Sequence, residues 1–278
     1  MKELYDKVST KCSYLATTSY STSFSLAIKC LDPSIRNPIC AIYGFVRFAD
    51  EIVDTFHEYD KAVLLERFKN DTYLAIEEKI SLNPILNSFQ HAVNRYNIDI
   101  ELIDQFLYSM EMDLTETHHD QSSYETYILG SAEVVGLMCL KVFCSGDKCE
   151  YDKLKPYAMK LGSAFQKINF LRDLNADFNG MGRTYFPGLN MQQFDESSKA
   201  QIEADIEHDF KEGFKGIKML PRSAKFGVYL AYVYYYSLFK KIKRTPSRNV
   251  IAQRIRIPNQ KKATILFYSY VKHRLNLI

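Results

Sequence analysis

Apolar side chains recur along this chain at steps of three and four residues, which is the period of an amphipathic α-helix. The pattern predicts helices over residues 1–30, 34–57, 60–80, 85–96, 99–114, 124–142, 153–177, 197–213 and 223–243, and from about residue 260. Pro33, Asn83-Pro84 and Gly146-Asp147 mark breaks between some of them. No segment shows the period of two that a half-buried strand requires. We therefore expect an all-α chain, forming one domain over residues 1–278 with its site between facing helices.

Composition supports a helical chain with a sizeable core. Of 278 residues, 46% are hydrophobic, whereas glycine and proline number only 11 and 8. The six cysteines form no C-x-x-C pair, which favours small core residues in a reducing cytosol over a zinc site. The first residues carry acids and no apolar stretch, so we expect no signal peptide. The longest weakly polar run, residues 226–239, is too short for a spanning helix, so we expect a cytoplasmic protein, soluble or peripheral at the inner face of the membrane.

Charge is unevenly distributed along the chain, although the net charge is only +3. All 33 acidic residues lie in residues 1–212, while residues 213–278 carry 15 of the Lys and Arg residues and no acid. A basic segment of this kind serves nucleic acid, an anionic membrane or an anionic substrate. Its charges are interleaved with apolar residues and no nucleic-acid motif is present, so we predict no nucleic-acid partner. A peripheral membrane surface and a plain solvated face are equally open, and so is the oligomeric state.

Two acidic motifs lie in apolar surroundings. The first comprises Asp50, Glu51 and Asp54, and the second comprises Asn169, Asp173 and Asp177. A spacing of four places side chains one turn apart on the same face of a helix. Because a buried carboxylate must be paired or bind a metal, two such helices facing each other would form a cage of hard oxygen ligands for Mg²⁺ and a diphosphate. Asp205 and Asp209 have the same spacing but a charged context, and we interpret them as a solvated helix face.

An arginine accompanies each of these two motifs, Arg47 in the first and Arg172 in the second. Such an arginine either neutralises the acids in a buried ion pair or grips a phosphate with its planar fork. No glycine-rich P-loop is present, and no G-x-G-x-x-G follows a strand, so a kinase and a Rossmann dehydrogenase are disfavoured.

Four segments, in this order, resemble the squalene and phytoene synthase family, and its bacterial phytoene synthases most. They are Ser21-Thr-Ser23-Phe24; Ala41-Ile-Tyr43-Gly-Phe-Val-Arg47-x-x-Asp50-Glu51-x-x-Asp54; Tyr127-x-x-Gly130-x-Ala132-x-x-Val135-Gly136; and Ala164-Phe-Gln166-x-x-Asn169-x-x-Arg172-Asp173-x-x-x-Asp177 with Gly182-Arg183-x-Tyr185-Phe186-Pro187. A basic cluster at Arg254 and Arg256 matches a late segment of the family. Three positions depart from it: Glu51 replaces a common Asp, Phe178 replaces a further acid, and Tyr20 replaces a His found in some relatives.

The resemblance implies an isoprenoid-synthase-type helical bundle with a central active-site cavity, and an Mg²⁺-dependent prenyltransferase in which Mn²⁺ can substitute. The implied reaction joins two geranylgeranyl diphosphates head to head, through a cyclopropyl diphosphate, to 15-cis-phytoene. The implied metal ligands are Asp50, Glu51, Asp54, Asn169, Asp173 and Asp177. The implied substrate-binding residues are Ser21, Arg47, Gln166, Asn169, Arg172, Arg183 and Arg254, and the implied catalytic residues are Tyr127, Tyr185, Arg47 and Arg172.

Two alternatives to phytoene synthesis are open. One is a C30 product, dehydrosqualene or squalene, made from farnesyl diphosphate, where squalene would also require a reductant such as NADPH. The other is a non-catalytic helical protein of the membrane surface. Intact acids in both motifs favour an enzyme, because a scaffold has no need for two sets of carboxylates in apolar surroundings.

Overall fold

A computed structural model describes residues 1–181, 183–189 and 194–275, with the side chains of residues 176–181 and 259 excepted. Its helices are α1 (Lys2–Tyr20), α2 (Thr22–Lys29), α3 (Pro33–Asp54), α4 (Lys61–Glu78), α5 (Pro84–Tyr96), α6 (Ile100–Thr115), α7 (Gln121–Ile128), the π-helix η1 (Leu129–Glu133), α8 (Val134–Cys144), α9 (Lys148–Met181), α10 (Glu196–Met219), α11 (Arg222–Lys243), α12 (Ser247–Ala252) and α13 (Asn259–Arg274). The prediction of an all-α fold is confirmed, because the described residues form helices and one isolated bridge between His118 and Thr184.

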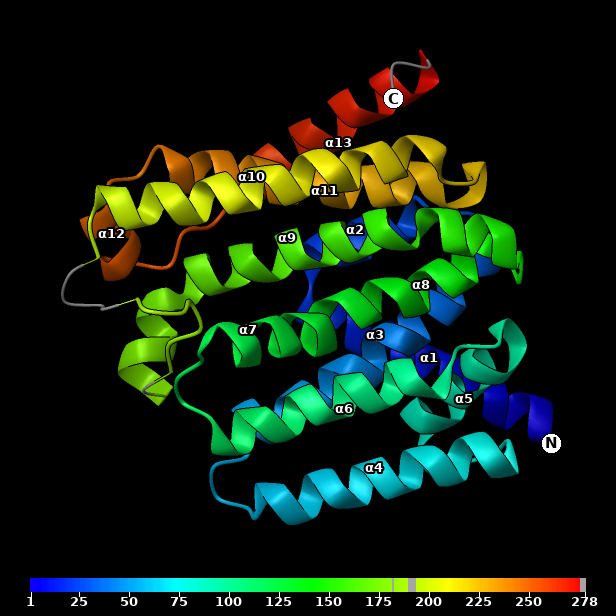
Figure 1. The fold of residues 1–278 in the computed structure, drawn as a ribbon. Coiled ribbons are helices and arrows are strands. Elements are labelled where there is room, and N and C mark those ends of the chain that lie inside the picture. The colour runs from blue at the N-terminus through cyan, green and yellow to red at the C-terminus, as the bar shows by residue number, and fades with distance from the viewer. Residues whose placement is uncertain (182, 190–193, 276–278) are drawn as a thin grey trace.

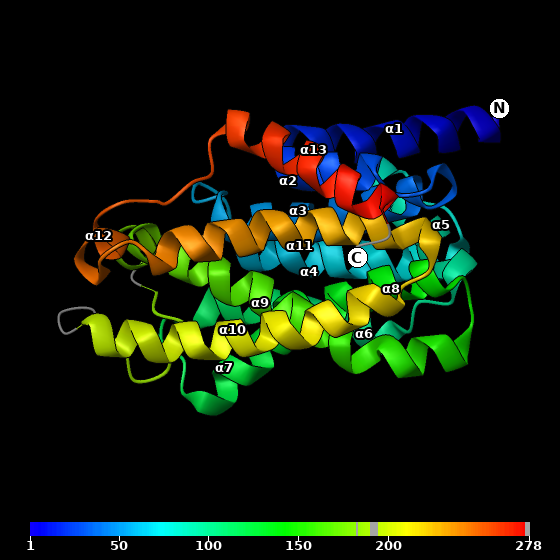
Figure 2. The same ribbon diagram turned by 90° about the horizontal axis from the view of Figure 1, so that it is seen from above.

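The long helices pack side by side around an aromatic core. In Figure 1, α4, α6, α8, α9 and α10 follow one another across the molecule, and each contacts the next. Figure 2 shows α11 on the adjoining face, with α13 packed against it. Phe45 of α3 stacks on Phe89 of α5 with ring centroids 3.9 Å apart and lies 5.2 Å from the ring of Phe106 of α6. These rings fix α3, and with it the first acidic motif, against the rest of the bundle.

The opening segment differs from the prediction, which placed a single helix over residues 1–30. The chain breaks at Ser21, whose backbone is extended and whose side chain accepts a hydrogen bond from the Phe24 amide, so that Ser21 is the N-cap of α2. A serine hydroxyl offers the backbone this alternative to a continuous helix. The break turns Phe24 of α2 toward α9 and α11, where its ring meets Phe165 and Tyr235.

The segment predicted as a helix over 124–142 contains a π-turn, η1, between α7 and α8. Gly130 allows the backbone of this turn to approach α6 closely. A Cβ at that position would lie 2.5 Å from the Gln105 carbonyl oxygen and 2.6 Å from Ser109 Cβ. Such contacts are too short for any side chain, so Gly130 is required where η1 crosses α6.

A further difference lies after residue 243, where the sequence predicted no helix before about residue 260. Ser247–Ala252 form the short helix α12 after Pro246, and the Asn175 side-chain amide of α9 donates to the Ile251 carbonyl oxygen over 2.5 Å. Proline before a first turn is a common helix start. The contact brings the residues that follow α12, including Arg254, next to the second acidic motif.

Candidate active site

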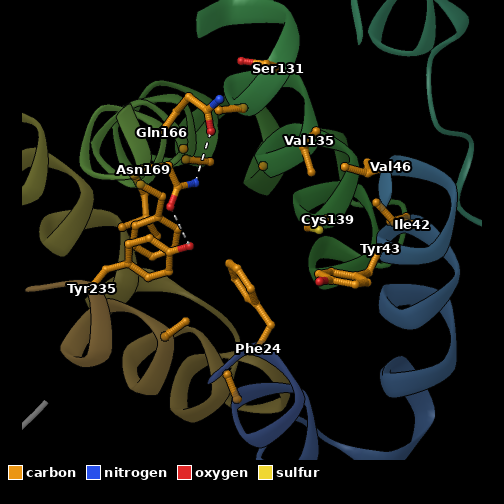
Figure 3. Close-up of a pocket in the computed structure, with 18 of the residues that line it drawn as sticks. Phe24, Ile42, Tyr43, Val46, Ser131, Val135, Cys139, Gln166, Asn169 and Tyr235 are labelled. Carbon is orange, nitrogen blue, oxygen red and sulfur yellow. Dashed lines mark hydrogen bonds between the residues drawn. The ribbon is translucent and has the colours of Figure 1, made fainter. Parts of the chain in front are cut away.

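A cavity of about 650 Å³ opens between α2, α3, α8, α9 and α11. Figure 3 shows Phe24 and Tyr235 on one part of its wall, with Tyr43, Ile42, Val135 and Cys139 on the other side of the space. The rings of Phe165 and Tyr235 stack with centroids 4.1 Å apart. Polar residues gather at one end and apolar residues line the remainder, so the cavity suits a ligand with a charged head and a long hydrocarbon chain.

Within the described residues, one helical run, Gln121–Cys144, is long and apolar enough to cross a membrane, and half of its most apolar window is buried inside the protein. Sequence reasoning had singled out 226–239 as the longest weakly polar run instead. Val135, Cys139, Leu140 and Phe143 of this run line the cavity. Its apolar character therefore serves the interior of the bundle.

The first acidic motif directs Asp50 and Asp54 toward the cavity from the last two turns of α3. Arg47, one turn earlier, has its Nη1 3.9 Å from Asp50 Oδ2 and stacks over the Tyr20 ring at 4.4 Å. Burial and the neighbouring Asp54 carboxylate raise the pKa of Asp50 to about 7. This end of the cavity thus holds negative charge that Arg47 only partly neutralises.

Glu51 is placed differently from its neighbours. It does not line the cavity and instead forms an ion pair with Arg47 on the same helix. The spacing of four that joins Arg47 to Glu51 makes this pairing local. Here Glu51 positions Arg47, and Asp50 and Asp54 are the carboxylates of this motif that face the cavity.

The second motif directs Gln166, Asn169 and Asp173 of α9 into the same cavity. Asn169 donates to Gln166 Oε1 at 3.3 Å and accepts from the Tyr235 hydroxyl at 3.4 Å, as the dashed lines in Figure 3 show. Asp173 is held by two arginines. Arg172 Nε lies 3.0 Å from its Oδ1, and Arg254 Nε lies 2.6 Å from the same oxygen. The side chain of Asp177 lies outside the described residues.

A buried carboxylate that the sequence analysis missed, Asp113 of α6, organises the remaining predicted residues. The Tyr127 hydroxyl donates to its Oδ2 at 2.8 Å, and the Tyr185 hydroxyl donates to its Oδ1 at 3.4 Å. Arg183 Nη1 lies 3.3 Å from Asp113 Oδ1 and 3.2 Å from Asp54 Oδ1, so it bridges this cluster to the first motif. Arg183 is therefore a counter-ion to two carboxylates in this structure, although the sequence analysis had assigned it to phosphate.

The sequence pattern of α6 could have identified Asp113 as a buried acid. Phe106, Met110 and Asp113 follow one another at steps of four and three, so an acid stands on the apolar face of α6. Burial raises the pKa of Asp113 to about 7, even though Arg183 opposes that rise. A carboxyl group poised near neutrality beside two tyrosine hydroxyls can hold or release a proton.

Ser21 lines the cavity beside Phe24 and has a backbone role as well, since its hydroxyl caps α2. The structure thus brings most of the predicted residues together around one space, from five separate segments. Those that line the cavity are Ser21, Arg47, Asp50, Asp54, Tyr127, Gln166, Asn169, Arg172, Asp173, Tyr185 and Arg254. Glu51 and Arg183 stand just behind this lining, each paired with a charged group of it.

The oxygen-rich donor set fits a hard divalent cation. Among the described residues, no three acidic, histidine or cysteine side chains converge closely enough to hold a metal by themselves. Asp50 and Asp54 face the cavity from α3, while Asn169 and Asp173 face it from α9. The raised pKa of Asp50, caused by burial and by the Asp54 charge, is the physical sign of carboxylates that lack a sufficient counter-charge.

The expectation of a solvated helix face holds for Asp205, whose side chain is 54% exposed, and is wrong for Asp209. Asp209 was interpreted as part of a solvated face, but it is completely buried between α10 and α9. Its carboxylate lies 2.7 Å from Lys167 Nζ and 3.0 Å from Lys160 Nζ, and it accepts from the Ser163 hydroxyl at 2.9 Å. These partners recur at steps of three and four on one face of α9, which makes the cluster a structural ion pair.

Comparison with known proteins agrees with this geometry. A 4,4'-diapophytoene synthase of Staphylococcus haemolyticus is 27% identical over 67% of this chain and 65% of that protein. A 15-cis-phytoene synthase of Synechococcus elongatus is 25% identical over 88% of this chain and 87% of that protein. The solved structure of a dehydrosqualene synthase with a ligand superposes with a TM-score of 0.81 at 19% identity, covering 98% of both chains.

The fold that this chain shares with the solved dehydrosqualene synthase is the one predicted from the motifs, an all-helical bundle. The sequence model of squalene/phytoene synthases matches residues 17–261, nearly the whole chain and all the segments that face the cavity. The protein therefore belongs to the squalene/phytoene synthase family, whose members are prenyltransferase-type enzymes of isoprenoid biosynthesis that act on prenyl diphosphates.

Proposed function

We propose that this single-domain protein is a 15-cis-phytoene synthase, joining two geranylgeranyl diphosphates head to head in the first committed step of carotenoid formation. One observation carries the proposal: carboxylates of α3 and α9 line the same cavity, together with a larger set of apolar and aromatic residues. Such a lining matches a diphosphate head and a prenyl tail. Phytoene synthases recur among its relatives, such as those of Synechococcus elongatus and Solanum lycopersicum.

Mg²⁺ is the metal that we propose, with Asp50, Asp54, Asn169 and Asp173 as its protein ligands and Mn²⁺ as a substitute. We also propose Asp177 as a metal ligand, because of its spacing from Asp173 in the sequence. Glu51 contributes to the metal site indirectly, through its ion pair with Arg47. When bound, the metal neutralises the charge that develops on the departing diphosphate. The donors lie on two walls, so the diphosphate oxygens would complete the coordination, as Mg²⁺ sites commonly do with phosphate substrates.

The protein's own residues bind and ionise the substrate. Arg172 and Arg254 form ion pairs with Asp173, and their guanidinium groups can also donate hydrogen bonds to phosphate oxygens. Arg47, paired with Glu51, adds a third cation at the facing wall. Breaking the carbon–oxygen bond sends its electron pair to the diphosphate, and these cations stabilise that anion more strongly as its charge grows.

The apolar end of the cavity protects the carbon chemistry that follows. The allylic cation is attacked by the second prenyl chain, giving a cyclopropyl diphosphate that ionises and rearranges. Aromatic rings such as Phe24, Phe165 and Tyr235 line this space, exclude water and offer their faces to a cation.

Loss of a proton ends the reaction, and the Tyr127–Tyr185–Asp113 cluster is our proposed acceptor. Both hydroxyls contact the Asp113 carboxyl group, and both tyrosines line the cavity. A proton taken by a tyrosine oxygen can be shared with Asp113, whose pKa is raised to about 7 by burial. In this relay Tyr127 and Tyr185 accept the proton from the substrate, and Asp113 accepts it from the tyrosines.

A C30 activity is the second candidate, and a specific observation favours it. The diapophytoene synthase of Staphylococcus haemolyticus and the superposed dehydrosqualene synthase are both among the similar proteins. That candidate uses the same polar end but a shorter prenyl substrate, farnesyl diphosphate. Squalene formation would also require a reductant such as NADPH. A non-catalytic protein of the membrane surface would have no use for the facing carboxylates.

We also propose a peripheral position at the cytoplasmic face of a membrane. Phe267 and Tyr268 of α13 and Leu275, which follows it, are exposed, and Lys272 Nζ lies 4.9 Å from the Tyr268 ring centroid. Exposed aromatic rings beside basic side chains are typical of surfaces that bind anionic lipid. Binding to anionic vesicles is expected to weaken as salt rises, and sedimentation that is insensitive to salt would contradict this surface.

The test of function is incubation with Mg²⁺ and either the C20 or the C15 diphosphate, followed by identification of the hydrocarbon. The proposal expects phytoene from the C20 substrate. Dehydrosqualene or squalene from the C15 substrate alone would establish the second candidate. Absence of hydrocarbon from both substrates, with or without NADPH, would exclude both enzyme activities.

A further inference from the structure

One face of α9 runs along the cavity from its polar end into its apolar part. Residues at steps of three and four on this helix all line the cavity, and so share that face: Leu154, Tyr157, Leu161, Phe165, Asn169 and Asp173. Asp173 stands at the polar end. Tyr157 precedes it by 16 residues, so at about 1.5 Å of rise per residue it lies about 24 Å away along the helix axis.

The part of the cavity farthest from Asp173 along α9 is formed by three neighbouring helices. Residues 145–147 join α8 to α9, so the last turn of α8 lies beside the first turns of α9, and α10 packs along α9 (Figure 1). All three helices contribute to the lining here. We refer to this region as the far end, and its lining residues are Leu140, Phe143, Leu154, Tyr157, Gly216 and Leu220.

Tyr157 stands at the far end, where α9 meets α10. A Cβ at Gly216 would overlap Tyr157 Cβ and lie 3.2 Å from Tyr157 Cγ. Gly216 therefore provides the space that the tyrosine occupies, because a side chain there would displace it. Between Leu154 and Phe165, a stretch that the structure describes in full, Tyr157 is the only residue lining the cavity that has a polar side chain.

The hydroxyl end of the Tyr157 side chain reaches toward the surface of α10. The Glu212 carboxylate and, to a smaller extent, the Tyr157 hydroxyl raise the pKa of Lys215, whose side chain is exposed. Such an influence requires the hydroxyl to lie near Lys215. A tyrosine readily places its apolar ring against a cavity and its polar tip near water. Tyr157 thus separates the far end from solvent.

We propose that Tyr157 closes the far end and sets the length of the longest prenyl chain that the cavity accepts. The inference rests on the proposed function, because it concerns the tail of the same prenyl diphosphate. With the diphosphate at Asp173, a C20 chain extends along α9 until its last isoprene unit meets the Tyr157 ring. A C25 chain would have to displace that ring, which is packed against the α10 backbone at Gly216.

The experiment measures binding of unreactive C15, C20 and C25 thiodiphosphates, in which sulfur replaces the bridging oxygen, by calorimetry on the full chain with Mg²⁺. The original protein should bind the C20 analogue at least about tenfold more tightly than the C25 analogue. Tyr157→Ala should bind the C25 analogue at least about tenfold more tightly than the original protein does, since burial of two further methylene groups corresponds to roughly that factor. Tyr157→Phe is the matched control, because it keeps the ring and should keep the original preference.

An unchanged affinity of Tyr157→Ala for the C25 analogue would overturn the proposal. An equal gain in Tyr157→Phe would also overturn it, because the hydroxyl rather than the ring would then set the limit. A gain of the same size for all three analogues would indicate a general loosening of the cavity and would refute the length limit. Thermal unfolding followed by circular dichroism checks each variant. If Tyr157→Ala is unfolded, Tyr157→Leu decides the question, because it shortens the side chain but keeps an apolar group against Gly216.

Failure of the proposed function has a different signature. If the analogues show the expected dependence on length but no hydrocarbon forms from the parent diphosphates, the length limit stands and the synthase reaction falls. If hydrocarbon forms and Tyr157→Ala shows no gain, the synthase stands and the length limit falls. If the original protein binds the C15 but not the C20 analogue, the gain in Tyr157→Ala should appear at C20, which would keep the role of Tyr157 and favour the C30 candidate.

Discussion

Asp50/Asp54 on α3 and Asp205/Asp209 on α10 have the same spacing and opposite surroundings. Burial and the Asp54 charge raise the pKa of Asp50 to about 7, because Arg47 offsets them only in part. Asp209 is more deeply buried, which by itself would raise its pKa, but hydrogen bonds from Lys167 hold that pKa below its ordinary value. Charge compensation, rather than spacing or depth, therefore separates a site that awaits a cation from one that already has its cations.

Removing a carboxylate should lower turnover in the cavity and lower stability in the α10 pair. Asp50→Ala and Asp173→Ala are expected to lower turnover by at least roughly 10²–10³-fold, the effect of losing a group that stabilises charge in the transition state. Both variants should remain folded, because neither carboxylate supports the core. The check is hydrocarbon formation together with a thermal melt, and near-normal turnover in either variant would contradict a metal cage at this end.

Asp209→Ala should act on stability. It leaves Lys167 and Lys160 without their buried partner, and breaking such a pair costs about 3–5 kcal/mol of unfolding free energy. Urea unfolding measures the change, and turnover per folded molecule is expected to stay near that of the original protein. A variant with unaltered stability would show that the buried cluster does not support the α9–α10 interface.

The pH dependence should separate the two regions as well. The folded-state pKa of Asp50 is raised above its unfolded value, so its stabilising contribution is complete below about pH 4 and is lost as pH rises through about 7. Without metal, the original protein should therefore lose stability relative to Asp50→Asn between pH 5 and 8. Mg²⁺ should bind more tightly over the same range, because protons compete with it less. Parallel melting curves for the two proteins would disprove this assignment.

The smallest effect is expected at Asp205, the exposed member of the α10 pair. Its carboxylate contacts Lys167 Nζ at 2.5 Å but its side chain is 54% exposed, and Lys167 keeps Asp209 as a second partner. Asp205→Ala should cost at most about 1 kcal/mol, as is usual for exposed ion pairs. A loss comparable to that of Asp209→Ala would mean that the two acids act as one unit.

Periodicity was sufficient for most of the fold because long helices reveal their apolar face directly. It failed at Ser21, where a hydroxyl cap interrupts a run of residues that could also continue a helix, and at α12, whose six residues are too few to show a period. The motifs located Asp50, Asp54, Asn169 and Asp173, since spacing within one helix is local information.

What could not be predicted depends on neighbours distant in the sequence. The burial of Asp209 requires Lys160 and Lys167 on another helix, and the pairing of Arg183 requires Asp54 and Asp113 on two others. Asp113 itself could have been found as an acid on an apolar helix face. Glu51 could not be separated from Asp50 by spacing, because both lie within reach of Arg47.

The late position of Arg254 in the sequence has a consequence for synthesis of the chain. The carboxylates of α3 and α9 emerge from the ribosome well before α11 covers the cavity, and before α12 brings Arg254 to Asp173. A nascent chain therefore carries an open apolar hollow rimmed by acids until its final helices arrive. Chains interrupted between α10 and α11 would keep both acidic motifs but expose this hollow, and they are candidates for capture by chaperones.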